Sequence, residues 1–270
     1  KRVSLEMGGK NPAIVMEDAD LDLAMEGLIW GAYGTTGQRC TATSRLIVHE
    51  DVHDALVERI IEKGSALTLG YGNDDDTEMG PLINQKALDK VSGYMDVARE
   101  DGATIAMGGE RATGEGLEEG FFFQPTLLTG VTRDMRVAKE EIFGPVLSVI
   151  KVKSFDEAIE VANDVKYGLS SAVYTKDVAR AFRALRPLRA LARRVGGLFE
   201  VLVERFHRLD VEHKVREVLV GVPVTDGRID GVSRRGGGAA AATVQRRADS
   251  PAAGIIGDAD ATRPRARWAR

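Results

Sequence analysis

The first 186 residues alternate short apolar runs with longer stretches in which apolar residues recur every three or four positions. Short runs are typical of buried strands, and the three-to-four spacing is typical of helices with one buried face. We expect strands at 11–16, 43–49, 103–107, 121–128, 147–152 and 170–174. Helices are expected at 21–32, 52–67, 85–101, 158–162 and 179–186. This alternation predicts an α/β domain with a largely parallel sheet.

The pattern changes at Pro187. Residues before it include 11 Arg and 10 Lys, whereas those after it include 15 Arg and one Lys. Residues 188–220 could form a helix or two, but the Gly-, Ala- and Arg-rich remainder lacks the apolar surface to offset its ordering entropy. We therefore expect a divergent tail at 187–270, partly disordered and outside the catalytic fold. The change resembles a reading-frame shift or a gene fusion, with a natural tail as the alternative.

The composition is that of an ordinary globular protein, with 43% hydrophobic and 29% charged residues. A net charge of −4 gives no reason to expect a nucleic acid or a membrane surface as partner. No apolar run approaches the roughly 20 residues that cross a bilayer. The chain opens at Lys1 without an initiator Met or a signal peptide, so we expect a piece of a longer protein.

Cys40 is the only cysteine, so the chain can form neither an internal disulfide nor a cluster of cysteine metal ligands. A single cysteine is more often a core residue than a nucleophile. The polar or flexible neighbours Gly37, Gln38, Arg39 and Thr41 favour a thiol presented on a loop. A free thiol also suits a reducing compartment, and we expect a cytoplasmic protein.

A single carboxylate, Glu6, lies 34 residues before Cys40, beside the glycine pair Gly8 and Gly9. A thiol and a carboxylate are the nucleophile and the base that covalent chemistry on a carbonyl requires. The alternative for Glu6 is a surface charge at a strand end. Lys10 and Asn11, which follow the glycine pair, could be solvent-facing.

Three motifs occur in order along this part of the chain: Leu5-Glu6-Met7-Gly8-Gly9-Lys10, Gly37-Gln38-Arg39-Cys40 and Glu140-Glu141-Ile142-Phe143-Gly144-Pro145-Val146. Their order and spacing resemble the catalytic region of the NAD(P)-dependent aldehyde dehydrogenases. The resemblance implies the end of a cofactor-binding domain at 1–6 and an α/β, parallel-sheet catalytic domain at 7–186, truncated and followed by a tail outside the family pattern. It also implies a parent enzyme that is a homo-oligomer.

The resemblance implies a role for each motif residue. Cys40 would be the nucleophile and Glu6 the general base. Glu141 would bind the ribose hydroxyls next to the nicotinamide of NAD or NADP, and Phe143 would line the nicotinamide pocket. The conformational freedom of glycine would allow Gly8 and Gly9 a backbone hinge or close approach to the cofactor. For Glu141 and Phe143 the alternatives are a loop carboxylate and an ordinary core residue. Neither the aldehyde nor the choice between NAD and NADP can be read from these residues.

In the implied reaction, the Cys40 thiolate adds to a small-molecule aldehyde and forms a thiohemiacetal. Hydride then leaves to NAD(P)+, and water hydrolyses the resulting thioester to a carboxylic acid. Glu6 would take a proton from the thiol or from the attacking water, and burial beside an apolar strand would suit a carboxylate to this task. The backbone N–H of Cys40 is one candidate donor to the oxyanion.

Two other functions remain open on these residues. The thiolate and Glu6 could hydrolyse an activated ester or thioester without a cofactor, or the chain could be an inactive folded remnant. A Cys–His hydrolase is disfavoured, because the spacing of the four histidines supports no triad with Cys40. No Cys/His cluster offers a zinc site, and the consecutive aspartates 74–76 are interpreted as a solvated turn, so no metal is expected.

Overall fold

A seven-stranded sheet forms the centre of the structure, a computed structural model that describes residues 6–114, 116–190 and, for the backbone, 192–196. The strands lie in the order β3-β4-β5-β2-β1-β6-β7, and all neighbours within these residues are parallel except the antiparallel β3 and β4. The largely parallel α/β sheet is therefore confirmed. The strands are β1 (Asn11–Val15), β2 (Thr43–His49), β3 (Thr104–Met107), β4 (Thr126–Thr129), β5 (Val146–Val152), β6 (Ser170–Tyr174) and β7 (Ala192–Gly196).

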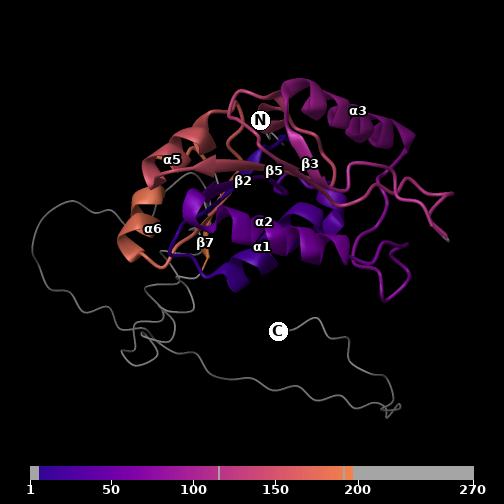
Figure 1. Ribbon diagram of the computed structural model, residues 1–270, viewed down its shortest axis with the longest axis horizontal. Helices are drawn as coiled ribbons and strands as arrows, with labels where there is room; N and C mark the ends of the chain where they lie inside the picture. Colours follow the sequence, from indigo (N-terminus) through magenta and orange to yellow (C-terminus); the bar gives the residue numbers. More distant parts are fainter. Residues whose placement is uncertain (1–5, 115, 191, 197–270) are drawn as a thin grey trace, which may run out of the picture. The chain divides into compact units, whose positions relative to one another are not determined.

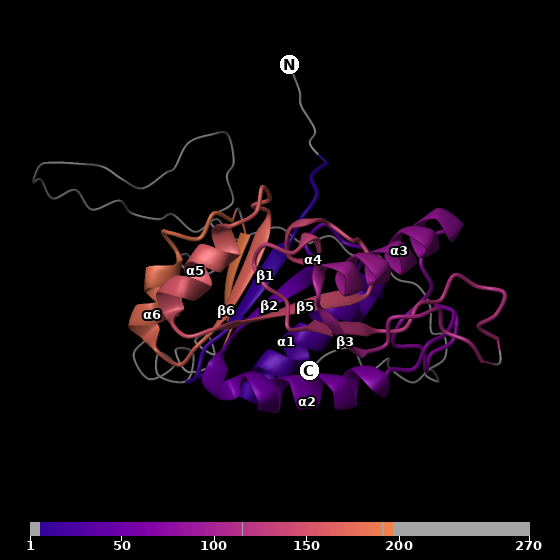
Figure 2. The ribbon, with the colours of Figure 1, turned by 45° about the horizontal axis from the view of Figure 1, so that its top comes forward.

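Helices cover both faces of the sheet, as Figures 1 and 2 show. One core lies between the sheet and α1 and α2, and the other between the sheet and α3, α4 and α5. Alternate residues of β1 enter the two cores, Ile14 on one side and Ala13 and Val15 on the other. This explains why the strand reads as a continuous apolar run. The helices are α1 (Leu21–Tyr33), α2 (Glu50–Ser65), α3 (Gln85–Asp101), α4 (Arg136–Lys139), α5 (Phe155–Asn163) and α6 (Val178–Ala184).

Side-chain caps define several helix starts. The Asp20 carboxylate accepts hydrogen bonds from the backbone N–H groups of Asp22 and Leu23 at the start of α1. Asn84 accepts from the N–H of Ala87 at the start of α3, which ends at Gly102 in a left-handed conformation with φ of 91°. The apolar residues predicted on one face of α1 are buried, and the turn that leads to Cys40 follows directly at the end of this helix.

The sheet extends beyond the boundary expected at residue 186. Leu188 is 2% exposed and belongs to the core beneath α5. The backbone of β7 pairs in parallel with β6 from Ser170–Ala192 to Tyr174–Gly196. This pairing satisfies backbone groups that would otherwise line an open edge of β6. The expectation of a divergent, partly disordered tail covers residues 187–270, of which 197–270 lie outside the described residues.

The predicted strand 121–128 is also shorter in the structure. β4 begins at Thr126, directly after Pro125, and Phe122 and Phe123 are buried in the preceding loop. A proline cannot donate the backbone hydrogen bond that a ladder inside the sheet needs, so the strand starts beyond it. The apolar run was therefore a correct indication of burial but not of strand geometry.

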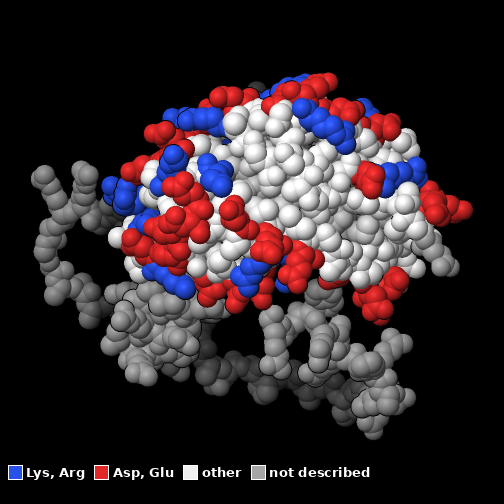
Figure 3. Space-filling model, in the orientation of Figure 1, with Lys and Arg blue, Asp and Glu red and all other residues white. Residues whose placement is uncertain are grey.

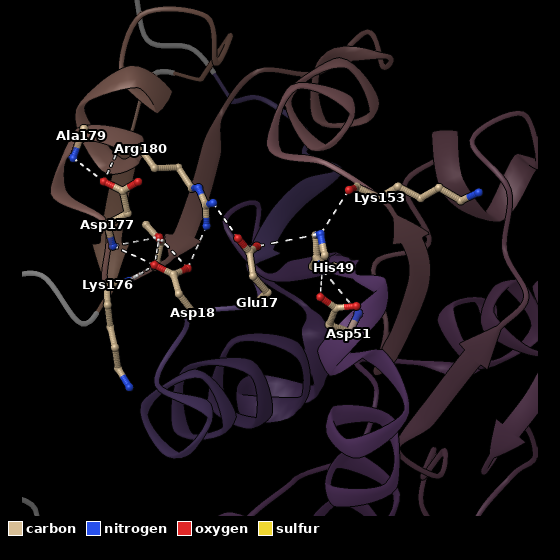
Figure 4. A network of polar contacts seen from close by, with 10 residues as sticks. Glu17, Asp18, His49, Asp51, Lys153, Lys176, Asp177, Ala179 and Arg180 are labelled. Carbon is tan, nitrogen blue, oxygen red and sulfur yellow. Dashed lines mark hydrogen bonds and ion pairs between the residues drawn. The ribbon is translucent and has the colours of Figure 1, made fainter.

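A polar network closes the carboxyl ends of β1, β2 and β6 (Figure 4). The Asp18 carboxylate accepts hydrogen bonds from the Thr175 hydroxyl, at 2.8 and 2.9 Å, and from the Arg180 guanidinium at 2.9 Å. Arg180 also donates to Glu17 at 2.6 Å, and Glu17 lies 3.9 Å from His49. The network ties the end of β1 to the start of α6. It lies at the opposite end of β1 from the turn that carries Cys40.

Candidate active site

The three sequence motifs meet in pairs at the amino-terminal ends of β1, β2 and β5. The Gly9 N–H donates to the Glu141 carboxylate at 2.7 Å, across 132 residues of sequence. The Asn11 side chain donates to the Cys40 carbonyl at 2.8 Å. A Cβ atom on Gly37 would lie 2.1 Å from the Gly144 carbonyl oxygen, so the backbones of these two segments touch. Residues far apart in the chain thus build one site.

The turn that presents Cys40 has unusual backbone geometry. Gly34–Gly37 (η1) follows α1, and Thr35, Thr36 and Gly37 have φ values of 61°, 58° and 65°. A positive φ is ordinary for glycine but strained for a β-branched threonine. Such strain persists only where surrounding contacts hold it, and it is often found at functional sites. Cys40 itself is exposed, as the loop prediction requires.

A neighbouring loop holds the strained turn in place. The Thr36 hydroxyl donates to the Gly80 carbonyl at 2.9 Å. The Gln38 side chain donates to the Pro81 carbonyl at 3.3 Å and accepts from the Ile83 N–H at 2.9 Å. These bonds join side chains of the turn to the backbone of residues 80–83. Gln38, two positions before Cys40, therefore helps to position the nucleophile.

Asn11 makes three hydrogen bonds that connect the parts of the site. Its side-chain N–H₂ donates to the carbonyl oxygens of Cys40 at 2.8 Å and Ala42 at 2.9 Å, and its oxygen accepts from the Ser170 N–H at 3.0 Å. Asn11 is 4% exposed and Lys10 is 1% exposed, so the solvent-facing interpretation of both residues is wrong. The sequence carried one hint, because both residues stand at the start of an apolar strand.

Arg45 holds the backbone directly after the glycine pair Gly8 and Gly9. Its guanidinium donates to the carbonyl oxygens of Lys10 at 2.9 Å and of Val161 and Ala162 at 2.8 Å each. Two of these oxygens belong to the last turn of α5, where carbonyl groups lack helical partners. Burial lowers the pKa of Arg45 to about 10, which leaves it charged at neutral pH. An arginine inside the apolar strand 43–49 was the signal that could have identified it.

The buried amine of Lys10 has no hydrogen-bond partner among the described residues. Burial, followed by the positive charge of Arg45, lowers the pKa of Lys10 to about 7, although Glu141 and Glu140 act in the opposite direction. The amine is therefore close to half protonated at neutral pH. Lys10 directly follows Gly9, so this charge lies next to the hydrogen bond between Gly9 and Glu141.

Glu6 lies outside this network. Its side chain is exposed, five residues before β1 begins, whereas the sequence predicted a carboxylate buried beside a strand. The difference arises because no described element packs over this segment. Gly8 is half-buried and Gly9 is buried, so burial begins three residues after Glu6. The structure thus brings Gly8, Cys40 and Glu141 into one site and leaves Glu6 at its margin.

Glu141, Gly8 and Phe143 form a small cradle. A Cβ atom on Gly8 would lie 2.5 Å from the Glu141 carboxylate, so Gly8 and the end of this side chain are in close contact. Phe143 has a φ of 61° and is 41% exposed, which excludes its interpretation as an ordinary core residue. The adjacent Glu140 is occupied elsewhere, accepting from the Tyr94 hydroxyl at 2.9 Å. Glu141 is half-buried against the glycine segment, and the exposed Phe143 lies two residues further along the chain.

Apolar side chains are exposed around the three motifs. Met7 is 47%, Trp30 57%, Ile83 77% and Phe143 41% exposed. Figure 3 shows acidic and basic side chains interspersed on the face it presents, with uncharged surface between them. Within the described ranges, no group of three or more His, Cys, Asp or Glu side chains could hold a metal ion. No helix in the same ranges has the length and apolar character needed to cross a bilayer.

Comparison with known proteins identifies the family. The sequence profile of the aldehyde dehydrogenase family matches residues 1–195, and the chain belongs to this family. Betaine aldehyde dehydrogenase of Mesorhizobium japonicum is 43% identical over 190 residues, which are 70% of this chain and 39% of the relative. α-Ketoglutarate semialdehyde dehydrogenase of Haloferax volcanii is 47% identical over 183 residues, 68% of this chain and 38% of the relative.

Solved structures agree with this assignment. A crystal structure of Staphylococcus aureus betaine aldehyde dehydrogenase in complex with NAD+ matches with a TM-score of 0.70 and 42% identity, covering 70% of this chain and 38% of that one. The chain therefore spans about two fifths of the length of the curated relatives it matches. The recognition of an aldehyde dehydrogenase catalytic region from its three motifs is confirmed.

Proposed function

We propose that this chain forms the catalytic domain of an NAD(P)-dependent aldehyde dehydrogenase, with Cys40 as the nucleophile. The convergence of the three motifs on the Cys40 turn is the observation that carries the proposal. Gly9 contacts the Glu141 carboxylate, and Asn11 holds the Cys40 carbonyl, so nucleophile and cofactor cradle share one rigid support. Membership of the aldehyde dehydrogenase family supports the same reaction class.

In this mechanism the Cys40 thiolate attacks the aldehyde carbon and forms a thiohemiacetal. The turn that carries Cys40 is held on both sides, by Asn11 at its carbonyl and by Gln38 at the neighbouring loop. These bonds hold the backbone of the turn in place, which reduces the entropy lost on reaching the transition state. The Cys40 N–H is one donor available to the oxyanion that develops on the aldehyde oxygen.

The cofactor would be held by Glu141, Phe143 and Gly8. The Glu141 carboxylate would accept hydrogen bonds from ribose hydroxyls, and the exposed Phe143 ring would contact the nicotinamide. The bound dinucleotide supplies the hydride acceptor, which converts the oxidation level of the aldehyde to that of a thioester. Solved relatives in complex with NAD+ support this choice of cofactor for the family.

Glu6 would act as the general base that activates the hydrolytic water. Its exposed position in the described residues lets it reach water. Hydrolysis of the Cys40 thioester then releases the carboxylic acid and restores the thiolate. General-base assistance of this kind contributes roughly 10²–10⁴-fold to rate.

The setting of the enzyme follows from the same chemistry. A reducing cytoplasm would keep the single thiol free for catalysis. The substrate would be a small aldehyde, and the complete enzyme would work as a homo-oligomer.

The proposal is tested by following dinucleotide reduction at 340 nm with propanal, a neutral aldehyde, and either NAD+ or NADP+. Because the cofactor-binding domain is expected largely outside this chain, residues 1–270 alone should show little or no activity, whereas a protein that includes that domain should reduce one or both; Cys40→Ser should abolish the reduction while retaining the fold. Full activity of Cys40→Ser would overturn the proposal. Hydrolysis of p-nitrophenyl acetate without any dinucleotide reduction would instead favour the cofactor-independent esterase.

A further inference from the structure

Two buried polar side chains near the amino-terminal ends of β1 and β6 have no hydrogen-bond partner among the described residues. They are the Lys10 amine, directly before β1, and the Ser171 hydroxyl on β6. Lys10 is 1% exposed and Ser171 is 3% exposed, so bulk water does not supply the missing hydrogen bonds. Ser171 lies two positions before Val173, which packs in the core beneath α5. Because side chains alternate along a strand, the Ser171 side chain faces that same side of the sheet.

Lys10 and Ser171 line the same small cavity, whose volume is about 10 Å³. Its walls also include Arg45 of β2, Ala162 at the end of α5 and the segment 188–190. One buried water needs a cavity of at least roughly 10–15 Å³ and two or more polar partners. The cavity therefore has the size for a single water, and two of its wall residues carry polar atoms that lack a partner.

The charged groups around Lys10 act on its amine without a hydrogen bond. Burial, followed by Arg45 on β2, lowers the pKa of Lys10 to about 7. Glu141 and Glu140, in the segment before β5, act in the opposite direction, and Lys90 on α3 lowers the pKa further. The amine is therefore present in both charge states near neutral pH. A water molecule can bond to either state, because it accepts from the ammonium and donates to the neutral amine.

We propose that this cavity binds one ordered water molecule, which bridges the Lys10 amine to the Ser171 hydroxyl. The water satisfies both buried groups, as is usual for polar groups inside proteins. Lys10 directly follows Gly9, whose N–H donates to the Glu141 carboxylate. The bridge thus connects the segment that contacts Glu141 to β6. It does not depend on the proposed dehydrogenase activity.

A dry cavity is the alternative explanation of the same geometry. A buried lysine can avoid the cost of an isolated charge by releasing its proton, without any water beside it. Ser171 then has no influence on the charge of Lys10. With a bridging water, the hydroxyl of Ser171 helps to hold the water that stabilises the ammonium, so the pKa of Lys10 depends on Ser171. The two explanations therefore make different predictions for substitutions at Ser171.

The test measures the pKa of Lys10 in the full chain by NMR of lysine carrying a carbon isotope label at Cε. The Lys10 signal is assigned as the one that is lost in Lys10→Met. Ser171→Val replaces the hydroxyl by methyl groups that occupy the space of the water, and valine is well suited to a strand. We expect Ser171→Val to lower the pKa of Lys10 by about 1 or more, because the ammonium loses a charged hydrogen bond.

Ser171→Ala removes the hydroxyl but leaves the space, so we expect the pKa of Lys10 to fall by a smaller amount. This variant introduces no added bulk and keeps the test decisive if Ser171→Val does not fold. Ser44→Ala is the matched control. The Ser44 hydroxyl is likewise buried without a partner among the described residues, but Ser44 does not line the cavity. Ser44→Ala should therefore leave the pKa of Lys10 unchanged.

A pKa of Lys10 that is the same in the wild type, Ser171→Val and Ser171→Ala would overturn the inference and support a dry cavity. A crystal structure of the same chain gives the direct observation. We expect one water within hydrogen-bond distance of both the Lys10 amine and the Ser171 hydroxyl, and its loss in Ser171→Val. A wild-type cavity without this water would contradict the inference. Neither measurement needs a dinucleotide or an aldehyde, so failure of the proposed dehydrogenase reaction would leave the result intact.

Discussion

The side-chain amide of Asn11 donates to the carbonyl oxygen of Cys40 at 2.8 Å and so joins the first strand of the sheet to the nucleophile. The same nitrogen donates to Ala42 at 2.9 Å, and the amide oxygen accepts from Ser170 at 3.0 Å. One buried side chain therefore connects β1, the Cys40 turn and β6. The position of the thiol depends on this connection as much as on its own loop.

Asn11→Asp should retain the hydrogen bond from Ser170 and remove the two hydrogen bonds to Cys40 and Ala42. The carboxylate can still accept from the Ser170 N–H, but its second oxygen would face two carbonyl oxygens. Unsatisfied buried polar groups cost about 1–3 kcal/mol each, so we expect a loss of several kcal/mol in the free energy of unfolding. Thermal unfolding measures the loss. A melting temperature equal to that of the wild type would show that Asn11 does not hold the turn.

Gly9→Ala should distort the site, because its Cβ would lie 2.3 Å from the Cys40 carbonyl oxygen. The Cys40 backbone and the Asn11 side chain, whose nitrogen would lie 2.7 Å from the new Cβ, leave little room to relax, and overpacking typically costs about 1–3 kcal/mol. We expect a lower melting temperature and a changed rate of Cys40 labelling by iodoacetamide. Gly93→Ala is the control: it is exposed in the interior of α3 with nothing within 4 Å of the new Cβ, and it should stabilise the helix by up to about 1 kcal/mol. Equal effects of the two variants would contradict the steric argument.

The stability of the protein should depend on pH through Lys10. The folded pKa of Lys10 is about 7, lowered by burial, whereas an unfolded lysine titrates at about 10.4. Between these values the unfolded chain binds one more proton than the folded one, so stability rises with pH in this window. The difference in unfolding free energy between the wild type and Lys10→Met should increase by about 1.4 kcal/mol per pH unit from pH 7 to 10. Lys86→Met, on the exposed face of α3, is the matched control, and a flat difference for Lys10→Met would refute the assignment.

Much of this fold follows from local pattern. β2, β6 and α3 have the bounds predicted for them, since β2 and β6 are uninterrupted strand-like runs and α3 lies between the cap Asn84 and the left-handed Gly102. The motifs identified which residues belong to the site, but not how these residues are arranged in space. The left-handed Thr35 and Thr36, and the three bonds of Asn11, depend on contacts between distant segments, which no local pattern encodes. The burial expected for Glu6 failed for the same reason, since covering that residue requires a neighbouring element.

Glu141→Gln should test the cofactor cradle. Glutamine can still accept from the Gly9 N–H, so the local structure is retained while the negative charge is lost. Hydrogen bonds to charged groups contribute about 1.5–3 kcal/mol, so we expect KM for the dinucleotide to rise roughly 10- to 100-fold. Glu140→Gln is the matched control, because Glu140 bonds to Tyr94 and should affect stability but not KM. Similar KM values for the two variants would remove Glu141 from the cofactor site.

The central claim is that oxidation proceeds through an acyl group on Cys40 that Glu6 helps to hydrolyse. Glu6→Gln should allow the first turnover but slow hydrolysis by roughly 10²–10⁴-fold, so the thioester accumulates. Mass spectrometry of the enzyme, quenched in acid after mixing with dinucleotide and propanal, should show a propanoyl group on the Cys40 peptide in nearly all molecules of this variant. A burst of reduced dinucleotide without an acyl group on Cys40 would contradict the account.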